Sequence, residues 1–170
     1  PESRITWLVE PKWLGLVRFY EQIDKVIVFK RAWRISSLWD LYQNLRQEHF
    51  DITLDLQRIF KSGFFSLLSR ARRRIGFHRR NAKEFNWMFN NEHIGYESDL
   101  LPKIMHYLKF TEYLDLPKPG NVEFGFSTLN AKQNTPRVVA DLARPYVAIV
   151  LSSSWETKNW HFEGYSDLIR

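Results

Sequence analysis

Residues 52–77 read ITLDLQRIFKSGFFSLLSRARRRIGF, and three elements can be predicted within them. Residues 52–56 form a short, mostly apolar run, which predicts a strand. The aromatic and leucine residues of FFSLL, residues 64–68, indicate a helix, and residues 73–77 indicate a second short strand. A strand, a helix and a strand in succession form the unit from which parallel α/β sheets are built.

The same alternation extends in both directions along the chain. Upstream, it predicts strands at residues 5–9 and 26–29 and helices at residues 13–20 and 38–45, with Ser36 or Ser37 as an N-cap. Downstream, residues 100–116 predict an amphipathic helix with one apolar face, formed by Leu101, Ile104, Tyr107 and Leu108. The sequence therefore predicts a parallel sheet with flanking helices.

A second domain is predicted to begin late in the chain. The sequence becomes rich in proline and polar residues between Pro117 and Pro136, and residues 146–151 (YVAIVL) then form its most strongly β segment. A serine-rich loop and a helix follow. We assign residues 1–135 to an N-terminal domain and residues 136–170 to a linker and the first strand, loop and helix of another. Because the chain starts at Pro1 and stops within the predicted last helix, we expect both ends to be incomplete.

The composition favours a folded protein with an anionic partner. Hydrophobic residues make up 44% of the 170 residues, and the net charge is +6 with a pI near 9.6. Such a basic excess suits nucleic acid, a nucleotide, a phosphorylated glycolipid or a membrane surface. The absence of cysteine excludes disulfides, thiolate zinc sites and cysteine nucleophiles, and fits a cytosolic protein. No run approaches the ~20 apolar residues of a membrane span.

The strongest candidate for phosphate binding is the loop after the predicted strand at residues 146–151. Ser153 and Ser154 can donate hydrogen bonds to a phosphate, and Lys158 can neutralise it, where a strand ends and a helix begins. A polar turn with an N-capping serine and a solvated lysine is the alternative. Neither a dinucleotide-binding glycine motif nor a P-loop is present. The histidines and carboxylates show no metal-ligand spacing, so we expect no metal.

Two basic clusters and one carboxylate are further candidates. The first cluster lies between Arg70 and Arg80, interrupted by a predicted strand. It suits RNA binding, or several of its arginines are solvated, as residues in charge runs usually are. The second follows the predicted strand at residues 26–29 and consists of Lys30, Arg31 and Arg34, which either bind an anion or form a basic loop. Asp55 is either a functional carboxylate or a cap at the end of its strand.

Three segments together resemble glycosyltransferase family 9, the heptosyltransferases of the lipopolysaccharide inner core. DITLDLQRIFKS at residues 51–62 is similar to the family pattern D-x-x-x-D-x-Q-G-x-x-K-S. RRIGF at residues 73–77, with NAKE at 81–84 and MFN at 88–90, is similar to a following R-x-G and A-R-E run. Ser153 and Ser154 through Lys158 and Trp160 resemble the phosphate loop that opens the family's second domain. ITWLV at residues 5–9 matches the family's second strand.

The resemblance implies a GT-B fold, in which two Rossmann-like domains face each other. It implies inverting, metal-free and cofactor-free transfer of a sugar, typically from ADP-heptose, to a phosphorylated lipid A and inner-core acceptor at the cytoplasmic face of the inner membrane. Ser153, Ser154 and Lys158 would bind the donor diphosphate. The acceptor-binding candidates are Lys30, Arg31, Arg34, Lys61 and Lys83.

The chain departs from the family pattern in ways that bear on activity. The aspartate regarded as the general base would precede Pro1, so the catalytic residue is unknown and we expect this chain to be inactive alone. Arg58 stands where the family usually has glycine, and Lys83 stands where an arginine is usual. The alternative function is a basic RNA-binding module that uses the cluster from Arg70 to Arg80, although the resemblance makes nucleic acid the weaker candidate. The oligomeric state is not indicated.

Overall fold

The structure, a computed structural model, describes residues 3–30, 35–117, 120, 149, 157 and 159–169. The chain divides into two compact units, residues 1–127 and residues 128–170, and each is described by itself. The predicted domain boundary between residues 135 and 136 lies outside the described residues, as does the predicted strand at residues 146–151 apart from Ile149. The assignment of two domains therefore stays a prediction.

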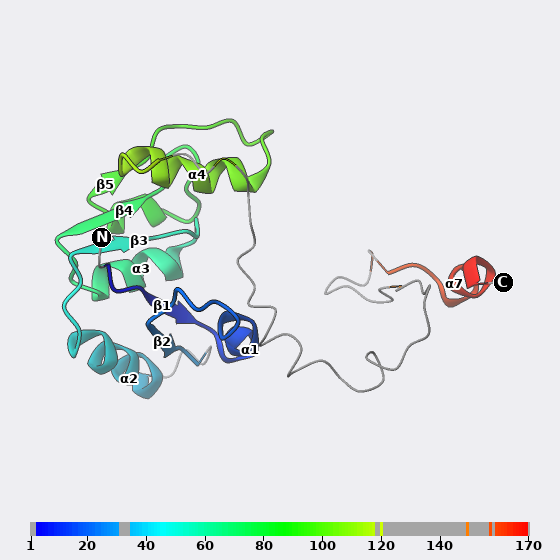
Figure 1. Cartoon of the computed structure of the whole chain (residues 1–170), viewed down its shortest axis with the longest axis horizontal. Helices are drawn as coiled ribbons and strands as arrows, with labels where there is room; N and C mark the ends of the chain where they lie inside the picture. Colours follow the sequence, from blue (N-terminus) through cyan, green and yellow to red (C-terminus); the bar gives the residue numbers. More distant parts are fainter. Residues whose placement is uncertain are drawn as a thin grey trace. The chain divides into compact units, whose positions relative to one another are not determined.

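The first unit alternates strands with helices along the chain (Figure 1). Its described elements are, in order, β1 (Thr6–Val9), the 3-10 turn η1 (Pro11–Trp13), α1 (Leu14–Val17), β2 (Lys25–Val28), α2 (Ile35–Arg46), β3 (Ile52–Leu54), α3 (Phe60–Leu68), β4 (Arg73–Gly76), the 3-10 turn η2 (Asn86–Phe89), β5 (Glu92–His93) and α4 (Lys103–Tyr113).

All described strand pairs are parallel, which confirms the predicted α/β class. One sheet has the order β1-β2 and the other has the order β3-β4-β5. The register places Trp7 beside Val26 in the first sheet and Leu54 beside Ile75 in the second. Among the described strands, β1 pairs with β2 alone, and the edge of β3 that faces away from β4 is likewise unpaired.

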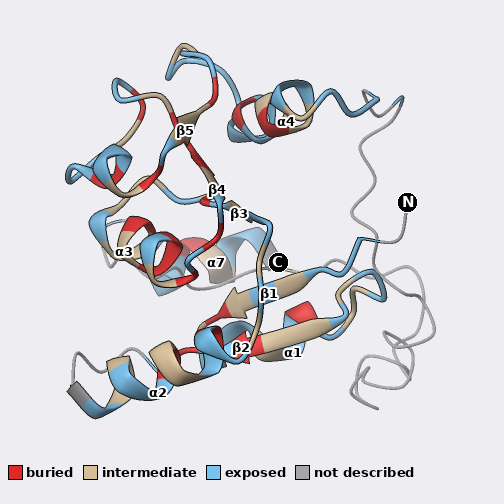
Figure 2. Ribbon diagram, turned by 90° about the vertical axis from the view of Figure 1, so that its left-hand side faces the viewer, coloured by how far each residue is buried: buried red, intermediate tan, exposed pale blue. Residues whose placement is uncertain are grey.

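Helix α3 links the two sheets. It connects β3 to β4, yet its Phe65 packs against Phe29 at the end of β2, with ring centroids 4.6 Å apart. These two residues share a buried core with Ile27 of β2 and with Leu41 and Leu45 of α2. Figure 2 shows the resulting buried seam along α2 and α3. Apolar side chains from both sheets therefore meet on one helix.

Helix α4 covers the other face of the second sheet. Thr53 of β3 contacts Ser69 at the end of α3, with their hydroxyl oxygens 2.7 Å apart, so this face of the sheet is the α3 side. Ile75 lies on the opposite face, because successive side chains of a strand alternate, and it packs with Phe110 of α4 in a second core that includes Phe77 and Ile94.

The predicted apolar face of α4 is wrong. The helix buries His106 and Phe110, whereas Leu101, Ile104 and Tyr107 remain about 40% exposed. A histidine can face inward here because Arg58 supplies a hydrogen bond to its ring. Apolar periodicity alone therefore does not identify the side of α4 that faces the sheet.

Several predicted boundaries also differ from the structure. Helix α2 begins at Ile35, so Ser36 and Ser37 lie inside its first turn and neither is its N-cap. The predicted helix at residues 13–20 is the shorter pair η1 and α1, while the long helix at 100–116 begins only after Pro102, which can occupy a helix N-terminus but not its interior. The two-residue β5 was not predicted, because it is too short to form a recognisable apolar run.

The second unit contains α7 (Phe162–Ile169), which confirms the predicted C-terminal helix. Trp160 precedes it and stacks on His161 at a centroid distance of 5.5 Å, with Tyr165 against its edge at 5.3 Å. The His161 Nδ1 atom accepts a hydrogen bond of 3.0 Å from the backbone N–H of Gly164. Local aromatic contacts therefore surround the start of this helix.

The contact between α3 and η2 gives a test of the packing. A Cβ atom added to Gly63 would lie 2.8 Å from the Asn86 side chain and 2.9 Å from its carbonyl oxygen, a distance that real Cβ atoms do not adopt. A Cβ atom on Gly15 of α1 would meet nothing within 4 Å. Gly63 and Gly15 thus form a matched pair: both lie in helices, but only Gly63 lacks room for a Cβ atom.

We expect Gly63→Ala to lower the free energy of unfolding by about 1–2 kcal/mol, because overpacking costs about 1–3 kcal/mol and the gain in helix propensity offsets part of it. Gly15→Ala is expected to leave stability unchanged or raise it by up to about 1 kcal/mol. Urea denaturation of both variants checks this. Equal stability of the two variants would contradict the packing described for η2.

Candidate functional site

The polar residues of interest lie where the parallel strands end. In parallel sheets the carboxyl ends of all strands share one edge, and ligands of open α/β folds bind beyond that edge. Here Glu10 follows β1, Lys30 comes two residues after β2, and Asp55 follows β3. The loops after β4 and β5 contain residues 77–85 and 94–102. The candidate site is this set of loops.

Lys61 lies in the first turn of α3 and is tied to the first sheet. Its Nζ atom is 2.8 Å from the Oε1 atom of Glu10 and 4.5 Å from the centre of the Phe29 ring. Only 18% of the Lys61 side chain is exposed. The ammonium group therefore has both a carboxylate and an aromatic partner at the ends of β1 and β2, and its predicted contact with an acceptor stays a prediction.

Lys30 and Lys83 are exposed, as expected for residues that meet a ligand. Lys30 directly follows Phe29, against which Lys61 packs, so these two predicted acceptor residues lie in neighbouring segments. Lys83 is held in a different loop, where its backbone N–H donates a hydrogen bond of 2.6 Å to the Arg58 carbonyl oxygen. Five predicted site residues lie outside the described residues: Arg31, Arg34, Ser153, Ser154 and Lys158.

Asp55 is buried, with an exposed fraction of 4%, and its carboxylate joins three segments. Its Oδ2 atom accepts hydrogen bonds from the side-chain amides of Asn86, at 2.6 Å, and Asn90, at 3.3 Å. Its Oδ1 atom accepts the backbone N–H of Gln57 at 3.1 Å. Burial raises the pKa of the Asp55 carboxyl, although the hydrogen bonds from Asn86, Ser62, Asn90 and Gln57 oppose the shift. The contacts agree with the capping alternative, because Asp55 fixes η2 and the turn after β3.

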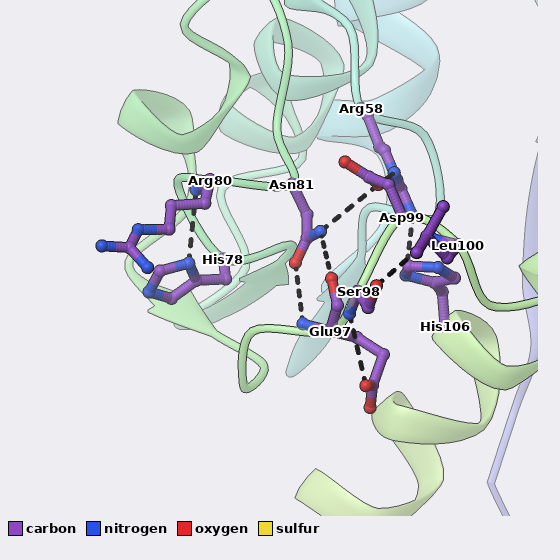
Figure 3. Close-up of polar contacts among 9 residues, drawn as sticks. All are labelled: Arg58, His78, Arg80, Asn81, Glu97, Ser98, Asp99, Leu100 and His106. Carbon is purple, nitrogen blue, oxygen red and sulfur yellow. Dashed lines mark hydrogen bonds and ion pairs between the residues drawn. The ribbon is translucent and has the colours of Figure 1, made fainter.

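Arg58 forms a second polar cluster in these loops (Figure 3). Its Nη1 atom donates to the Oδ1 atom of Asp99 at 2.7 Å, and its Nη2 atom lies 2.8 Å from the Nδ1 atom of His106. The guanidinium carbon is 4.8 Å from the centre of the Phe77 ring. The hydrogen bond from Arg58 lowers the pKa of the Asp99 carboxyl. An arginine can make both contacts at once because its guanidinium is planar and has several donors.

Asn81, in the loop after β4, bonds to the loop after β5 that contains Asp99. Its Nδ2 atom donates to the Glu97 carbonyl oxygen at 2.7 Å, and its Oδ1 atom accepts the Glu97 backbone N–H at 3.0 Å. No sequence pattern pointed to Asp99 or His106, and Asn81 was named only as the first residue of the NAKE segment at residues 81–84. The one available signal was the arginine at position 58, where the family pattern has glycine.

Comparisons with known proteins agree with this fold. The family model described as "Glycosyltransferase family 9 (heptosyltransferase)" matches residues 38–170. The chain belongs to glycosyltransferase family 9. It is 26% identical over 171 aligned positions to the lipopolysaccharide core heptosyltransferase OpsX of Haemophilus influenzae, covering 99% of this chain and 48% of that protein.

Solved structures of the same family share the fold. The Escherichia coli heptosyltransferase WaaC with ADP superposes with a TM-score of 0.72 at 18% identity, over 99% of this chain and 53% of that one. WaaC with ADP-2-deoxy-2-fluoro heptose gives a TM-score of 0.73 at 20% identity, over 99% of this chain and 56% of that one. The family 9 glycosyltransferase from Veillonella parvula gives 0.68 at 16% identity, over 99% and 50%. This family 9 chain thus has the predicted Rossmann-like α/β fold, shared with these structures, and spans about half their length.

Three arginines of the Arg70–Arg80 cluster have contacts within this family 9 chain. Arg73 forms a two-pronged ion pair with Glu92, with nitrogen–oxygen distances of 2.9 and 2.8 Å. Arg74 donates to the backbone carbonyl oxygens of neighbouring segments, at 2.9 and 3.1 Å, and Arg80 lies over the ring of Tyr96. The comparisons give the RNA-binding alternative no support.

The described part of the chain contains neither a helix suited to crossing a membrane nor a cluster of metal-ligating side chains. None of its described helices has the length and apolarity that crossing a bilayer requires. No three of its described His, Asp or Glu side chains gather as metal ligands would.

The raised pKa of Asp55 predicts how stability depends on pH. A carboxyl whose pKa is raised by folding binds its proton more tightly in the folded state. Its contribution to stability is therefore fully present below the ordinary value of 3.8, and it is lost as pH rises through the raised value. Asp55→Asn has no titrating group at this position. The stability of the wild type relative to Asp55→Asn should thus fall as pH rises across that window, by at most about 1.4 kcal/mol per pH unit.

Urea denaturation of wild type and Asp55→Asn at a series of pH values measures this difference. Asp51→Asn, at the exposed start of β3, serves as the control for loss of a surface charge. A relative stability of the wild type that rises with pH across the window would contradict the effect of burial on Asp55.

Proposed function

We propose that the polypeptide containing this chain transfers heptose from ADP-heptose to the inner core of lipopolysaccharide. The match of the family 9 model to residues 38–170 is the observation that carries this proposal. OpsX, a lipopolysaccharide core heptosyltransferase, and WaaC, solved with ADP and with an ADP-heptose analogue, support the acceptor class and the donor class. Because the chain covers about half of each relative, we propose that it does not catalyse transfer alone.

The acceptor is proposed to bind at the basic loops of the first unit. A phosphorylated lipid A and inner-core saccharide carries several negative charges, which Lys30, Arg31, Arg34, Lys61 and Lys83 would neutralise. Lys30 and Lys83 are exposed and free to move toward a ligand, whereas Lys61 would have to share its charge with Glu10. The contribution of Lys61 to acceptor binding is therefore proposed to be the smaller one.

The donor diphosphate is proposed to bind at Ser153, Ser154 and Lys158. The hydroxyl groups and the start of the following helix would donate hydrogen bonds, and Lys158 would stabilise the negative charge that gathers on the departing diphosphate. The reaction is proposed to invert the anomeric centre and to need no metal or other cofactor. The catalytic base is not assigned to a residue of this chain.

The protein is proposed to work at the cytoplasmic face of the inner membrane without spanning it. The acceptor's lipid tails lie in the bilayer, so the sugar and its phosphates are presented at the surface. Basic residues near anionic lipids gain about 1 kcal/mol each. The net charge of +6 supports such a peripheral contact.

Steady-state kinetics on the complete polypeptide tests both substrate assignments. We expect Lys158→Ala to lower kcat, because a cation aimed at the leaving diphosphate stabilises the transition state more than the ground state, at a cost of about 2.7–4 kcal/mol by analogy with loss of an oxyanion donor. Lys83→Ala should mainly raise the acceptor KM. Donor and acceptor concentrations are varied separately to distinguish these effects.

Lys103→Ala, at the exposed start of α4, is the control for the loss of one positive charge. Near-normal kcat and donor KM in Lys158→Ala would contradict the proposal that the donor diphosphate binds at Ser153, Ser154 and Lys158. Wild-type protein that transfers no heptose from ADP-heptose to inner-core acceptors would overturn the proposed function.

A further inference from the structure

Arg58 contacts all three loops that leave the second sheet at its carboxyl edge. It belongs to the loop between β3 and α3. Its carbonyl oxygen accepts the backbone N–H of Lys83, in the loop after β4, at 2.6 Å. Its guanidinium group bonds to Asp99, in the loop after β5, and to His106, which follows on α4. In Figure 3 the side chains of Asp99 and His106 converge on Arg58 from this third loop and its helix.

Beyond Ile94, which is buried in the second core and bonds to Gly76, the third loop depends on polar contacts for its conformation. Leu100 at its tip is 96% exposed, so it adds almost no apolar burial. The backbone N–H groups of Leu100 and Leu101 bond only to Ser98, within the loop itself. The bonds that reach other segments come from Asn81, from Lys109, 3.4 Å from Glu97, and from Arg58. The bond from Arg58 is the only one of these that extends to the turn after β3.

The environment of Arg58 is suited to holding a fixed geometry. The guanidinium lies over the Phe77 ring, and 21% of the side chain is exposed. His106 is buried, with an exposed fraction of 2%, so its ring offers a rigid acceptor on α4. A flat cation on an aromatic ring, with two directed hydrogen bonds, loses little further freedom when the loops close around it.

We propose that Arg58 is a positioning residue for the acceptor: it holds the loops after β4 and β5 together so that the acceptor surface beside Lys83 is already formed before binding. This inference rests on the proposed function. If the loops occupy the binding-competent arrangement for only a fraction of the time, the apparent affinity for the acceptor is the intrinsic affinity multiplied by that fraction. We call the contacts of the Arg58 side chain with Phe77, Asp99 and His106 the clamp. Removal of the clamp therefore weakens acceptor binding without changing the chemical step.

Kinetics of variants in the complete polypeptide test this role. Arg58→Ala and Asp99→Ala are each expected to raise the acceptor KM roughly tenfold, the factor that one charge-assisted hydrogen bond is worth. The donor KM and kcat stay within about twofold. The double variant is no worse than Arg58→Ala, because that substitution already removes the bond to Asp99. Arg58→Lys lies between wild type and Arg58→Ala, since one ammonium cannot make both of the guanidinium contacts.

Arg79→Ala is the matched control, because it removes an exposed arginine from the neighbouring loop and leaves the clamp intact. A rise in acceptor KM for Arg79→Ala equal to that for Arg58→Ala would assign the effect to charge and overturn the proposal. If the acceptor KM rises for Arg58→Ala and does not change for Asp99→Ala, Arg58 contacts the acceptor directly. This result would also overturn the proposal. Lower thermal stability of Arg58→Ala with an unchanged acceptor KM would leave Arg58 only a structural role and would overturn the proposal as well.

Hydrogen exchange gives a readout that does not depend on the reaction. The backbone amides of Glu97 and Leu101 should exchange about tenfold faster in Arg58→Ala than in Arg79→Ala, since loop opening limits their exchange. Unchanged exchange would overturn the clamp even if the enzyme is active. If Arg58→Ala exchanges faster but the wild-type protein transfers no heptose, the clamp is retained and the proposed function is overturned instead.

Discussion

The packing of Phe65 against Phe29 is the contact on which the first unit depends. A sheet of two strands is not stable in water by itself, so β1 and β2 need a helix on their apolar face. Helix α2 supplies part of that cover, and α3 supplies the rest through Phe65. The same helix carries Lys61 to Glu10 at the end of β1. Apolar packing thus fixes where the charged ends of the strands lie.

A buried polar network then fixes the loops after β3 and β4. Taking a carboxylate such as Asp55 out of water is costly, and the cost is offset only because the amides of Asn86 and Asn90 and a backbone N–H bond to it. Gly63 and Gly76 leave the space that these two asparagines occupy. The backbone of the turn after β3 is therefore held in place at Asp55, three residues before Arg58, which stabilises the start of the loops that carry the candidate site.

The elements that could be predicted are those whose signal is local. The four longer strands are short apolar runs between turn residues, a pattern typical of parallel strands. The burial that was predicted for the run at residues 5–9 is only partial, because Trp7 is 41% exposed. The inward face of α4 could not be predicted, because His106 is buried only through its bond with a residue 48 positions earlier. The ion pair between Arg58 and Asp99 spans 41 positions, and no spacing rule covers such a distance. Family resemblance, in contrast, pointed to position 58 by its departure from glycine.

Among the described strands, β1 and β3 each have one side without a partner, and this has a consequence for the behaviour of the chain in solution. Alternate backbone groups of a parallel strand point to each side, so each of these strands offers a row of hydrogen-bonding groups beside the half-exposed Trp7, Ile52 and Leu54. The net charge of +6 keeps separate molecules apart at low ionic strength. At physiological salt that repulsion is screened beyond about 8 Å, a distance too short to prevent strands of two molecules from meeting. The colloidal stability of the chain should therefore decrease as salt is added.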